Sequence, residues 1–443
     1  MSSEFNFFQQ WYPLSPLQDL KRDRPTPVTL LGMRLVIWKP QNADNFRVFL
    51  DQCPHRLAPL SEGRVDEETG NLMCSYHGWQ FDQGGVCTQI PQLDQEQLDK
   101  NIPQQYCVLS YPTREEQDLL WVWADPHSAD LAKTTPLPRS PQIDAEKGFV
   151  WDSFVRDLPY DWQTLIENVA DPSHVPFTHH GVQGNRKQGR PIAMEIVESS
   201  MQLVEVQLDR ARKTTIMFLP PCRLEYTIQI GTEGKQLGLI TYCIPTEPGK
   251  SRIVAQFSRN FAKNIQKITP RWWEHLKVRN SVLDGDMIVL HQQEAFLQQK
   301  QEPNAWKTAY KLPASSDRLV IEFRKWFDKY CGGQLPWEKV GITAPITQIN
   351  EDRKVLLDRY HQHTQHCESC RQTLANIQKI QVILLILSVT SLVSVAVFND
   401  SWRGQWGIPL MLFGLLSLGI YSGLKWWLEP QFYFVDYVHA DKR

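Results

Sequence analysis

One cysteine and one histidine recur in each of two short segments of the chain, CPH at 53–55 and CSYH at 74–77. A Rieske [2Fe-2S] cluster has two cysteines on one iron and two histidines on the other. Zinc also accepts two cysteines and two histidines, but zinc fingers pair cysteine with cysteine and histidine with histidine. The alternating order therefore predicts an iron–sulfur cluster with four ligands, Cys53, His55, Cys74 and His77.

The residues around these ligands narrow the type of cluster protein. Rieske subunits of respiratory and photosynthetic cytochrome complexes carry a second cysteine in each loop, and these two cysteines form a disulfide. Ala58 and Tyr76 occupy those places in this chain. The segment is therefore similar to the ferredoxin and oxygenase branch, in which histidine ligands and hydrogen bonds to sulfur tune the reduction potential.

Two further histidines, His174 and His179, lie in the segment ENVADPSHVPFTHHG at 167–181. Residues five apart on a regular helix point about 140° away from each other, so both imidazoles can reach one metal only if the helix is interrupted. Pro172 and Pro176 are expected to interrupt it. Two histidines and one carboxylate on one face of Fe(II) leave positions open for dioxygen and substrate.

The segment also matches a longer pattern, Asn-x-x-Asp-x-x-His-x4-His, through Asn168, Asp171, His174 and His179. This pattern resembles the mononuclear iron motif of Rieske non-haem iron oxygenases. With GGVCTQIPQ at 84–92 and CESC at 367–370, the likeness spans nearly the whole chain. These segments resemble the pheophorbide a oxygenase group, which includes the plant lethal-leaf-spot proteins, a Rieske component of the chloroplast import translocon and protochlorophyllide-dependent relatives.

This resemblance implies a Rieske [2Fe-2S] cluster, a mononuclear non-haem Fe(II) and a catalytic domain of helix-grip fold. It also implies a homotrimer, in which Asp171 joins a cluster histidine of one subunit to His174 or His179 of the next. Asp171 and Asn168 are therefore expected to take part in catalysis.

The third iron ligand is expected from a helix late in the catalytic domain, where family members place an aspartate. The segment VLDGDMIVLHQQE at 282–294 offers Asp284 and Asp286. Asp286 has the better spacing to His291 and Glu294, so it is the favoured ligand, and Asp284 is the alternative.

Cys367 and Cys370 form a Cys-x-x-Cys pair near histidines 361, 363 and 366. This pair could form half of a zinc site, but no second cysteine pair accompanies it. The resemblance instead favours a redox-switchable dithiol, and two thiols without a role are the remaining alternative.

The pattern of strands followed by long helices predicts an α+β protein. We expect an all-β Rieske domain at 1–128, a proline-rich linker at 129–147 and the iron-binding catalytic domain at 148–345. A helical segment with the Cys-x-x-Cys pair follows at 346–378, then a two-helix membrane anchor at 379–427 and a tail at 428–443.

The membrane prediction depends on two stretches without charged residues, 380–399 and 404–424. Each reaches the length of about 20 residues that a transmembrane helix needs, although two buried core helices are an alternative. The short spacer at 400–403 predicts a transmembrane hairpin. Arg371, Lys379 and Lys425 predict that the catalytic domains face the cytoplasm, at the cell membrane or the thylakoid.

The overall composition excludes some functions. The net charge is −2, from 47 basic and 49 acidic residues, so nothing indicates nucleic-acid binding. The nine cysteines are irregularly spaced, which favours a reducing compartment over a disulfide framework. Residues 1–11 lack the features of a leader peptide, which departs from the plant relatives and favours a cyanobacterial source.

These observations predict an oxygenase that uses dioxygen against a hydrophobic ring substrate. The chain lacks the Gly-x-Gly-x-x-Gly fingerprint of a dinucleotide site, so ferredoxin or a reductase must supply electrons. The resemblance and the membrane anchor favour a chlorophyll-derived tetrapyrrole such as a pheophorbide or chlorophyllide, and leave the product open. The alternative is a non-catalytic redox sensor or assembly factor that uses only the cluster and the dithiol.

Overall fold

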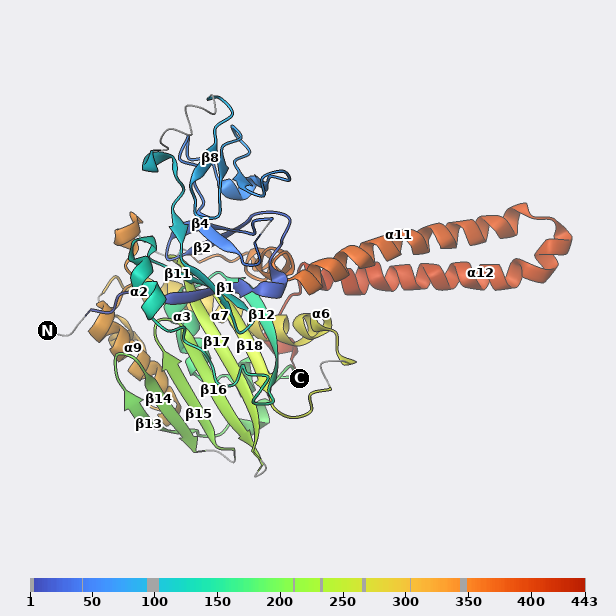
Figure 1. The fold of residues 1–443 in the computed structure, drawn as a ribbon. Coiled ribbons are helices and arrows are strands. Elements are labelled where there is room, and N and C mark those ends of the chain that lie inside the picture. The colour runs from blue at the N-terminus through green and yellow to red at the C-terminus, as the bar shows by residue number, and fades with distance from the viewer. Residues whose placement is uncertain are drawn as a thin grey trace.

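The computed structural model describes residues 4–41, 43–93, 103–209, 212–231, 234–264, 268–302, 304–342 and 349–442. A β-rich N-terminal domain lies above a large twisted sheet that carries helices on one face, and a long helical hairpin projects from their junction (Figure 1). The predicted α+β fold is therefore confirmed. The expected boundary at 345/346 lies outside the described residues.

The N-terminal domain contains three small antiparallel sheets, of strand order β1-β11-β10, β2-β3-β4-β9 and β5-β6-β7-β8. The first sheet is almost fully buried, because every residue of β1 and β11 is buried. The strands are β1 (Trp11–Pro16), β2 (Thr26–Leu30), β3 (Met33–Trp38), β4 (Arg47–Leu50), β5 (Arg64–Val65), β6 (Leu72–Met73), β7 (Gln80–Phe81), β8 (Cys87–Gln89), β9 (Ser110–Tyr111), β10 (Thr113–Glu116) and β11 (Leu119–Trp123).

This domain is attached to the catalytic sheet by backbone hydrogen bonds. In the turn between β2 and β3, the Leu31 amide donates to the Pro245 carbonyl at 2.9 Å and the Gly32 amide donates to the Thr246 carbonyl at 2.7 Å. The mainly apolar segment 28–38 therefore contains parts of two strands, which a tight turn joins.

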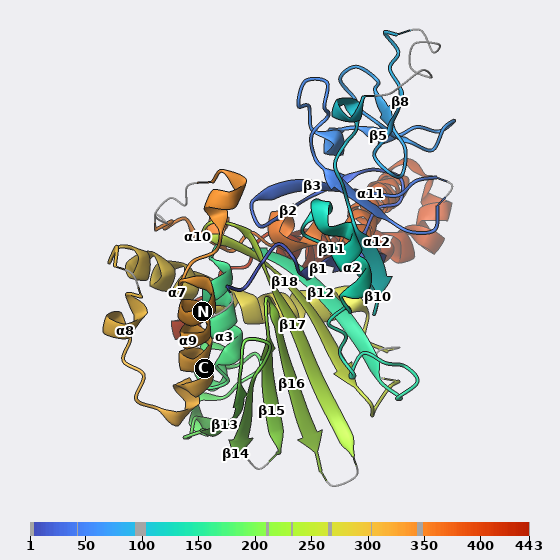
Figure 2. The same cartoon turned by 60° about the vertical axis from the view of Figure 1, so that its left-hand side comes forward.

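The catalytic domain is built on one seven-stranded antiparallel sheet of order β12-β18-β17-β16-β15-β14-β13. Helices α3, α7 and α9 lie against this sheet (Figure 2). The strands are β12 (Val150–Leu158), β13 (Ala193–Ser199), β14 (Val204–Asp209), β15 (Thr214–Leu219), β16 (Arg223–Ile230), β17 (Lys235–Glu247) and β18 (Lys250–Arg259). The helices are α3 (Trp162–Ala170), α4 (Val175–Thr178), α6 (Arg271–Glu274), α7 (Asn280–Gln298), α8 (Trp306–Ala309), α9 (Arg318–Cys331) and α10 (Arg353–Leu356).

One element has no clear signal in the sequence, and another lies where a linker was expected. The edge strand β13 has mostly exposed residues, so its sequence lacks the apolar alternation that identifies a half-buried strand. The expected linker at 129–147 begins with a short helix, α2 (Ala129–Thr134), which follows a 3-10 turn capped by Asp125.

The C-terminal hairpin consists of α11 (Glu368–Val397) and α12 (Asp400–Gly423). Both helices are long and apolar enough to cross a membrane, and most of their apolar side chains are exposed. The expected spacer at 400–403 is wrong, because these residues form the first turn of α12. Asn399 caps that helix by accepting a hydrogen bond from the Trp402 amide at 3.0 Å.

The chain returns from the hairpin to the catalytic domain. The Arg359 amide donates to the Tyr433 carbonyl at 2.9 Å. Farther along, the Tyr437 hydroxyl donates to the Thr178 carbonyl at 2.9 Å. The C-terminal tail therefore contacts the segment that carries His174 and His179.

Candidate active site

Two matching loops carry the predicted cluster ligands. The Cys53 amide donates to the Ala58 carbonyl, and the Cys74 amide donates to the Trp79 carbonyl. Each cysteine carbonyl in turn accepts a hydrogen bond from the amide four residues later, at Leu57 or Gly78. These two later residues have positive φ angles of 59° and 75°, so both loops turn back in the same way.

The four side chains of these loops face one another as a cluster requires. Cys53 and Cys74 are buried and their thiols share a hydrogen bond, whereas His55 is exposed and His77 is half-buried. The two imidazole rings lie 4.5 Å apart, and His55 stacks on Trp79. Two thiols on the inside and two imidazoles at the surface fit the two irons of a Rieske cluster.

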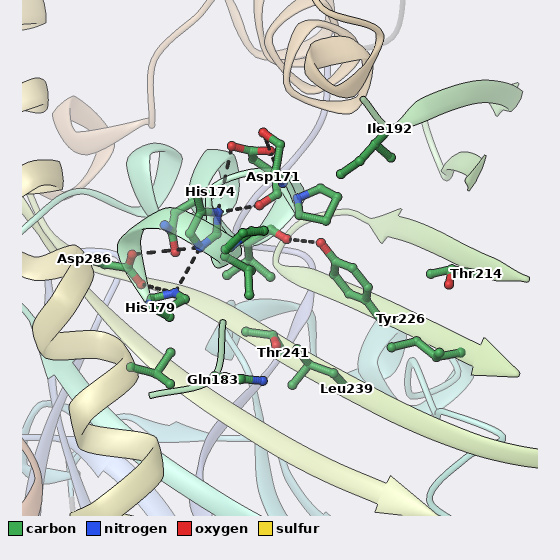
Figure 3. A pocket seen from close by; sticks show the side chains of 18 of the residues that line it. Asp171, His174, His179, Gln183, Ile192, Thr214, Tyr226, Leu239, Thr241 and Asp286 are labelled. Carbon is green, nitrogen blue, oxygen red and sulfur yellow. Dashed lines mark hydrogen bonds and ion pairs between the residues drawn. The ribbon is translucent and has the colours of Figure 1, made fainter. Parts of the chain in front are cut away.

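A second site lies between α3 and α7, where His174 and His179 bracket the four-residue helix α4. Their Nε2 atoms approach to 3.2 Å (Figure 3). His174 Nδ1 donates to the Asp171 carbonyl at 2.5 Å, so its Nε2 holds a lone pair. The helix is interrupted as expected, because α3 ends at Ala170 and α4 has only four residues. Pro176 does not cause the interruption, since it lies in the first turn of α4, where proline is tolerated.

Asp286 of α7 completes this group. Its carboxylate oxygens lie 3.5 Å from His179 Nε2 and 3.9 Å from His174 Nε2, and Asn168 hydrogen-bonds the same carboxyl group. The ligand atoms of His174, His179 and Asp286 all lie within 4.8 Å of one another. Two imidazoles and one carboxylate at these distances fit a mononuclear iron.

Burial shifts the pKa of His179 and the pKa of Asp286 when no metal is bound. Burial, with a smaller contribution from His174, lowers the pKa of His179 to about 3, so its imidazole is neutral and able to bind a metal. Burial also raises the pKa of Asp286 to about 7, against the opposing effects of His174 and Asn168. A metal ion would replace the proton on this carboxyl group.

Asp284, the alternative ligand, points away from the two histidines. Its carboxylate lies 2.8 Å from Arg156 and 2.6 Å from Arg359, and all three side chains are at most 2% exposed. Between the two aspartates, a Cβ on Gly285 would lie 3.1 Å from both the Thr178 carbonyl and the Tyr437 ring. The structure therefore brings Asp286, and not Asp284, to the two histidines.

Asp171 lies at the surface beside this group. Its Oδ1 accepts hydrogen bonds from the Ser173 amide at 2.7 Å and the Ser173 hydroxyl at 2.5 Å. Its Oδ2 lies 3.8 Å from His174 Nδ1, and its side chain is 26% exposed. The sequence left open whether Asp171 lies next to His174 or His179, and in the structure it lies next to His174.

His291 and Glu294, whose spacing favoured Asp286 as the ligand, form hydrogen bonds with residues at and just before the start of α3. His291 Nδ1 donates to the Pro159 carbonyl at 2.7 Å. Glu294 accepts hydrogen bonds from the Asp161 amide and the Thr164 hydroxyl. Both contacts hold α7 against the start of α3, and so they fix Asp286 relative to the histidine segment.

A cavity of about 700 Å³ opens onto His174, His179 and Asp286. Its walls come from the sheet, α3, α7 and the loop at 188–192, and Figure 3 shows Tyr226, Leu239 and Thr241 along the strands. Most of the lining is apolar, and it includes Ile228, Ile253 and Phe257. The cavity is thus large and hydrophobic, and it ends at the candidate iron ligands.

Cys367 and Cys370 lie away from this cavity. Both are fully buried where α11 begins, and their thiols face His275 and His363. His363 is a neighbour of the cysteine pair in sequence, but His275 could not be identified from the sequence, because 92 residues separate it from Cys367. The contact of Tyr437 with the histidine segment could not be identified either, because the tail sequence carries no signal for it.

Three family models match the chain. The model described as Rieske [2Fe-2S] domain matches residues 10–112, and that of the vanillate O-demethylase oxygenase C-terminal domain matches residues 160–210. The model described as pheophorbide a oxygenase matches residues 218–304.

Known proteins resemble the chain over most of its length. It is 36% identical to pheophorbide a oxygenase of Oryza sativa subsp. japonica, over 99% of this chain and 86% of that protein. It is 32% identical to flavonoid 8-hydroxylase 2 of Ocimum basilicum, over 82% of this chain and 72% of that protein. The fold is similar to dicamba monooxygenase bound to dicamba, with a TM-score of 0.60 and 19% identity, over 74% of this chain and 98% of that one.

Proposed function

The chain belongs to the pheophorbide a oxygenase family of Rieske non-haem iron oxygenases, and we propose that it oxidises a chlorophyll-derived tetrapyrrole with dioxygen. The observation that carries this proposal is the large apolar cavity that ends at two histidines and one carboxylate. Pockets of about 300–1,000 Å³ with few polar groups suit hydrophobic ligands of this class.

The two cofactors of the family are a Rieske cluster and a mononuclear iron. We assign the cluster to Cys53, His55, Cys74 and His77, and the iron to His174, His179 and Asp286. When bound, the iron supplies dioxygen activation, and the cluster supplies electrons that it receives from an external donor such as ferredoxin or a reductase.

Neighbouring residues hold these ligands in place. The Asp171 carbonyl accepts a hydrogen bond from His174 Nδ1, which keeps the proton on Nδ1 and leaves Nε2 free to bind the metal. Asn168 donates to Asp286 and orients its carboxylate toward the histidines. Apolar side chains of the cavity wall lie around this centre and would limit the access of water.

We propose that the enzyme is a trimer in which electrons cross between subunits. Asp171 is partly exposed, and Ser173 engages its Oδ1. Its Oδ2 is therefore placed to accept a hydrogen bond from a cluster histidine of another subunit, and His55 is exposed as such a contact requires.

The substrate proposal also depends on charge. Pheophorbides and chlorophyllides are carboxylic acids with a large apolar ring. Arg190 is exposed and lines the cavity, so it offers a cation for such a carboxylate while the ring lies against the apolar walls. A sensor that used only the cluster would need neither this cavity nor the second metal site.

We propose that α11 and α12 anchor the enzyme in a membrane. Both helices pass the length and hydropathy requirement of a membrane span, and their exposed surface is apolar. A hairpin keeps both globular domains on one side, and Lys379 and Lys425 favour the cytoplasmic side. A membrane-bound enzyme could take its hydrophobic substrate from the lipid phase.

A single-turnover experiment tests the proposed function. The chemically reduced protein is mixed with ¹⁸O-labelled dioxygen and pheophorbide or chlorophyllide, while absorbance follows oxidation of the cluster. We expect oxidation that depends on the substrate and a product that contains ¹⁸O. Oxidation at the same rate without substrate, with no labelled product from either pigment, would contradict the proposal.

A further inference from the structure

Four buried side chains converge at the base of the helical hairpin. His275 lies in the π-helical turn His275–Arg279 between α6 and α7, and His363 lies in the π-helical turn Tyr360–Thr364. Cys367 and Cys370 lie at the first turn of α11. All four side chains have 0% exposure, and their ligand atoms lie within 4.8 Å of one another.

Three nitrogen–sulfur separations are close to those around one tetrahedral metal ion. His275 Nδ1 lies 3.5 Å from the Cys367 sulfur and 3.9 Å from the Cys370 sulfur. His363 Nε2 lies 3.4 Å from the Cys370 sulfur. Zinc bonds of about 2.3 Å to sulfur and 2.0–2.1 Å to nitrogen, at tetrahedral angles, place sulfur and nitrogen about 3.5 Å apart.

The outer nitrogen of each imidazole already has an oxygen partner. His275 Nε2 lies 3.3 Å from the Asp152 carboxylate, and His363 Nδ1 lies 2.6 Å from the Val155 carbonyl. When an imidazole donates its outer N–H to oxygen, the inner nitrogen carries a lone pair. Histidines that bind metals in proteins are usually oriented in this way, by a carboxylate or a carbonyl.

We propose that His275, His363, Cys367 and Cys370 bind one Zn²⁺ as a structural site, separate from the two iron sites. Four protein ligands leave no open position, which is characteristic of structural zinc. The donor set equals that of the Rieske cluster, but all four donor atoms here are close enough to surround a single ion. Binding releases the protons of the two thiols, and no electron transfer is involved.

The site would fasten the hairpin to the catalytic domain. Cys367 and Cys370 begin α11, whereas His275 belongs to the helical segment that continues into α7 and carries Asp286. Around the site, Asp19 accepts a hydrogen bond from the Glu368 amide at 2.9 Å and pairs with Arg271 at 2.7 Å. One metal ion would therefore join the membrane anchor to the helix of the active site.

The first experiment uses the full-length protein in detergent, purified under reducing conditions without added metal. Elemental analysis should find about one zinc per chain in addition to iron. X-ray absorption at the zinc edge should show two sulfur ligands at about 2.3 Å and two nitrogen ligands at about 2.0–2.1 Å. Four nitrogen or oxygen ligands, or no zinc, would overturn the proposal.

The second experiment compares variants. Cys367→Ser and Cys370→Ser should each lower the zinc content at least about tenfold, because a hydroxyl is a poor zinc ligand. His361→Ala and Cys331→Ser are matched controls, since His361 is exposed two residues from His363 and Cys331 is a half-buried thiol elsewhere. Both controls should retain zinc, and retention of zinc in Cys367→Ser would overturn the proposal.

A third measurement distinguishes zinc from a redox dithiol. In protein purified without reductant, we expect Cys367 and Cys370 to be detected as free thiols by mass spectrometry once zinc has been removed under denaturing conditions. If the native protein is isolated without zinc and with a disulfide between these two cysteines, the proposal is overturned. The X-ray absorption result on the unmodified protein stands even if a variant fails to fold.

Discussion

The candidate iron site and the candidate zinc site differ in how completely the protein surrounds them. His174, His179 and Asp286 occupy one side of a metal position and face a cavity of about 700 Å³. His275, His363, Cys367 and Cys370 offer four ligand atoms within 4.8 Å of one another, and all four side chains are fully buried. An open site suits a reaction with dioxygen, whereas a closed site suits a structural role.

The two sites share one helical segment. His275 and Asp286 are 11 residues apart in sequence, which corresponds to about 16 Å of helix at 1.5 Å per residue. The buried ion pairs of Asp284 with Arg156 and Arg359 lie along the same segment. The segment thus contributes one residue to the candidate iron site and one to the candidate zinc site.

The largest effect is expected from Asp286→Ala. Loss of the carboxylate leaves two protein ligands, so mononuclear iron and turnover should both be lost, while the Rieske spectrum and the zinc remain. Metal analysis and electron paramagnetic resonance measure this outcome.

Asp284→Asn is the matched variant. It should retain the iron but destabilise the fold by about 3–5 kcal/mol, because Arg156 and Arg359 lose a buried partner. Thermal unfolding measures this loss. Full iron content in Asp286→Ala, with loss of iron in Asp284→Asn, would identify Asp284 as the ligand.

Asp171→Asn should retain both iron cofactors and the zinc, yet lower turnover by about 100-fold or more, because an amide oxygen is a weaker acceptor than the carboxylate for the cluster histidine of the neighbouring subunit. Stopped-flow oxidation of the reduced cluster in the presence of substrate measures the effect. Asp130→Asn, on the exposed surface of α2, should react like the unmodified protein. Equal rates for Asp171→Asn and the unmodified protein would remove Asp171 from the electron path.

Metal removal compares the two sites directly. Dialysis of the native protein against a chelator should extract the mononuclear iron, because its site opens onto a cavity and offers three protein ligands. The zinc should remain until the protein unfolds. Elemental analysis at successive times measures both metals, and faster loss of zinc than of iron would contradict the assignment of an open and a closed site.

The smallest effect is expected at the cavity. Arg190→Ala should raise KM for a pheophorbide or chlorophyllide about threefold to tenfold with little change in kcat, because the lost contact binds substrate and transition state equally. Arg186→Ala is the control, since Arg186 lies on the preceding turn outside the cavity lining. A fall in kcat at constant KM would show that Arg190 acts on the reaction instead.

The Rieske ligands could be proposed from the sequence because each half of the site is local. Cys53 and His55 share one loop, Cys74 and His77 share the other, and hydrogen bonds within each loop shape it. The same holds for the segment from Asn168 to His179. The apolar length of α11 and α12 is likewise visible from composition alone.

The tertiary structure decided what depends on contacts between distant segments. Asp284 and Asp286 have the same type of side chain on one helix, and only the packing of α7 directs one to the arginines and the other to the histidines. The strand β13 is held by pairing with β14 although its own sequence is mostly polar.

The candidate zinc site shows the same division most clearly. The sequence by itself determined that two cysteines lie one helical turn apart beside several histidines, since that spacing is local. It could not identify His275 as their partner, because the fold brings together residues 92 apart through the packing of α6 against α11. The spacing of nearby residues can be read from the sequence. The distance between remote side chains depends on how the helices and strands pack when the whole domain buries its apolar surface.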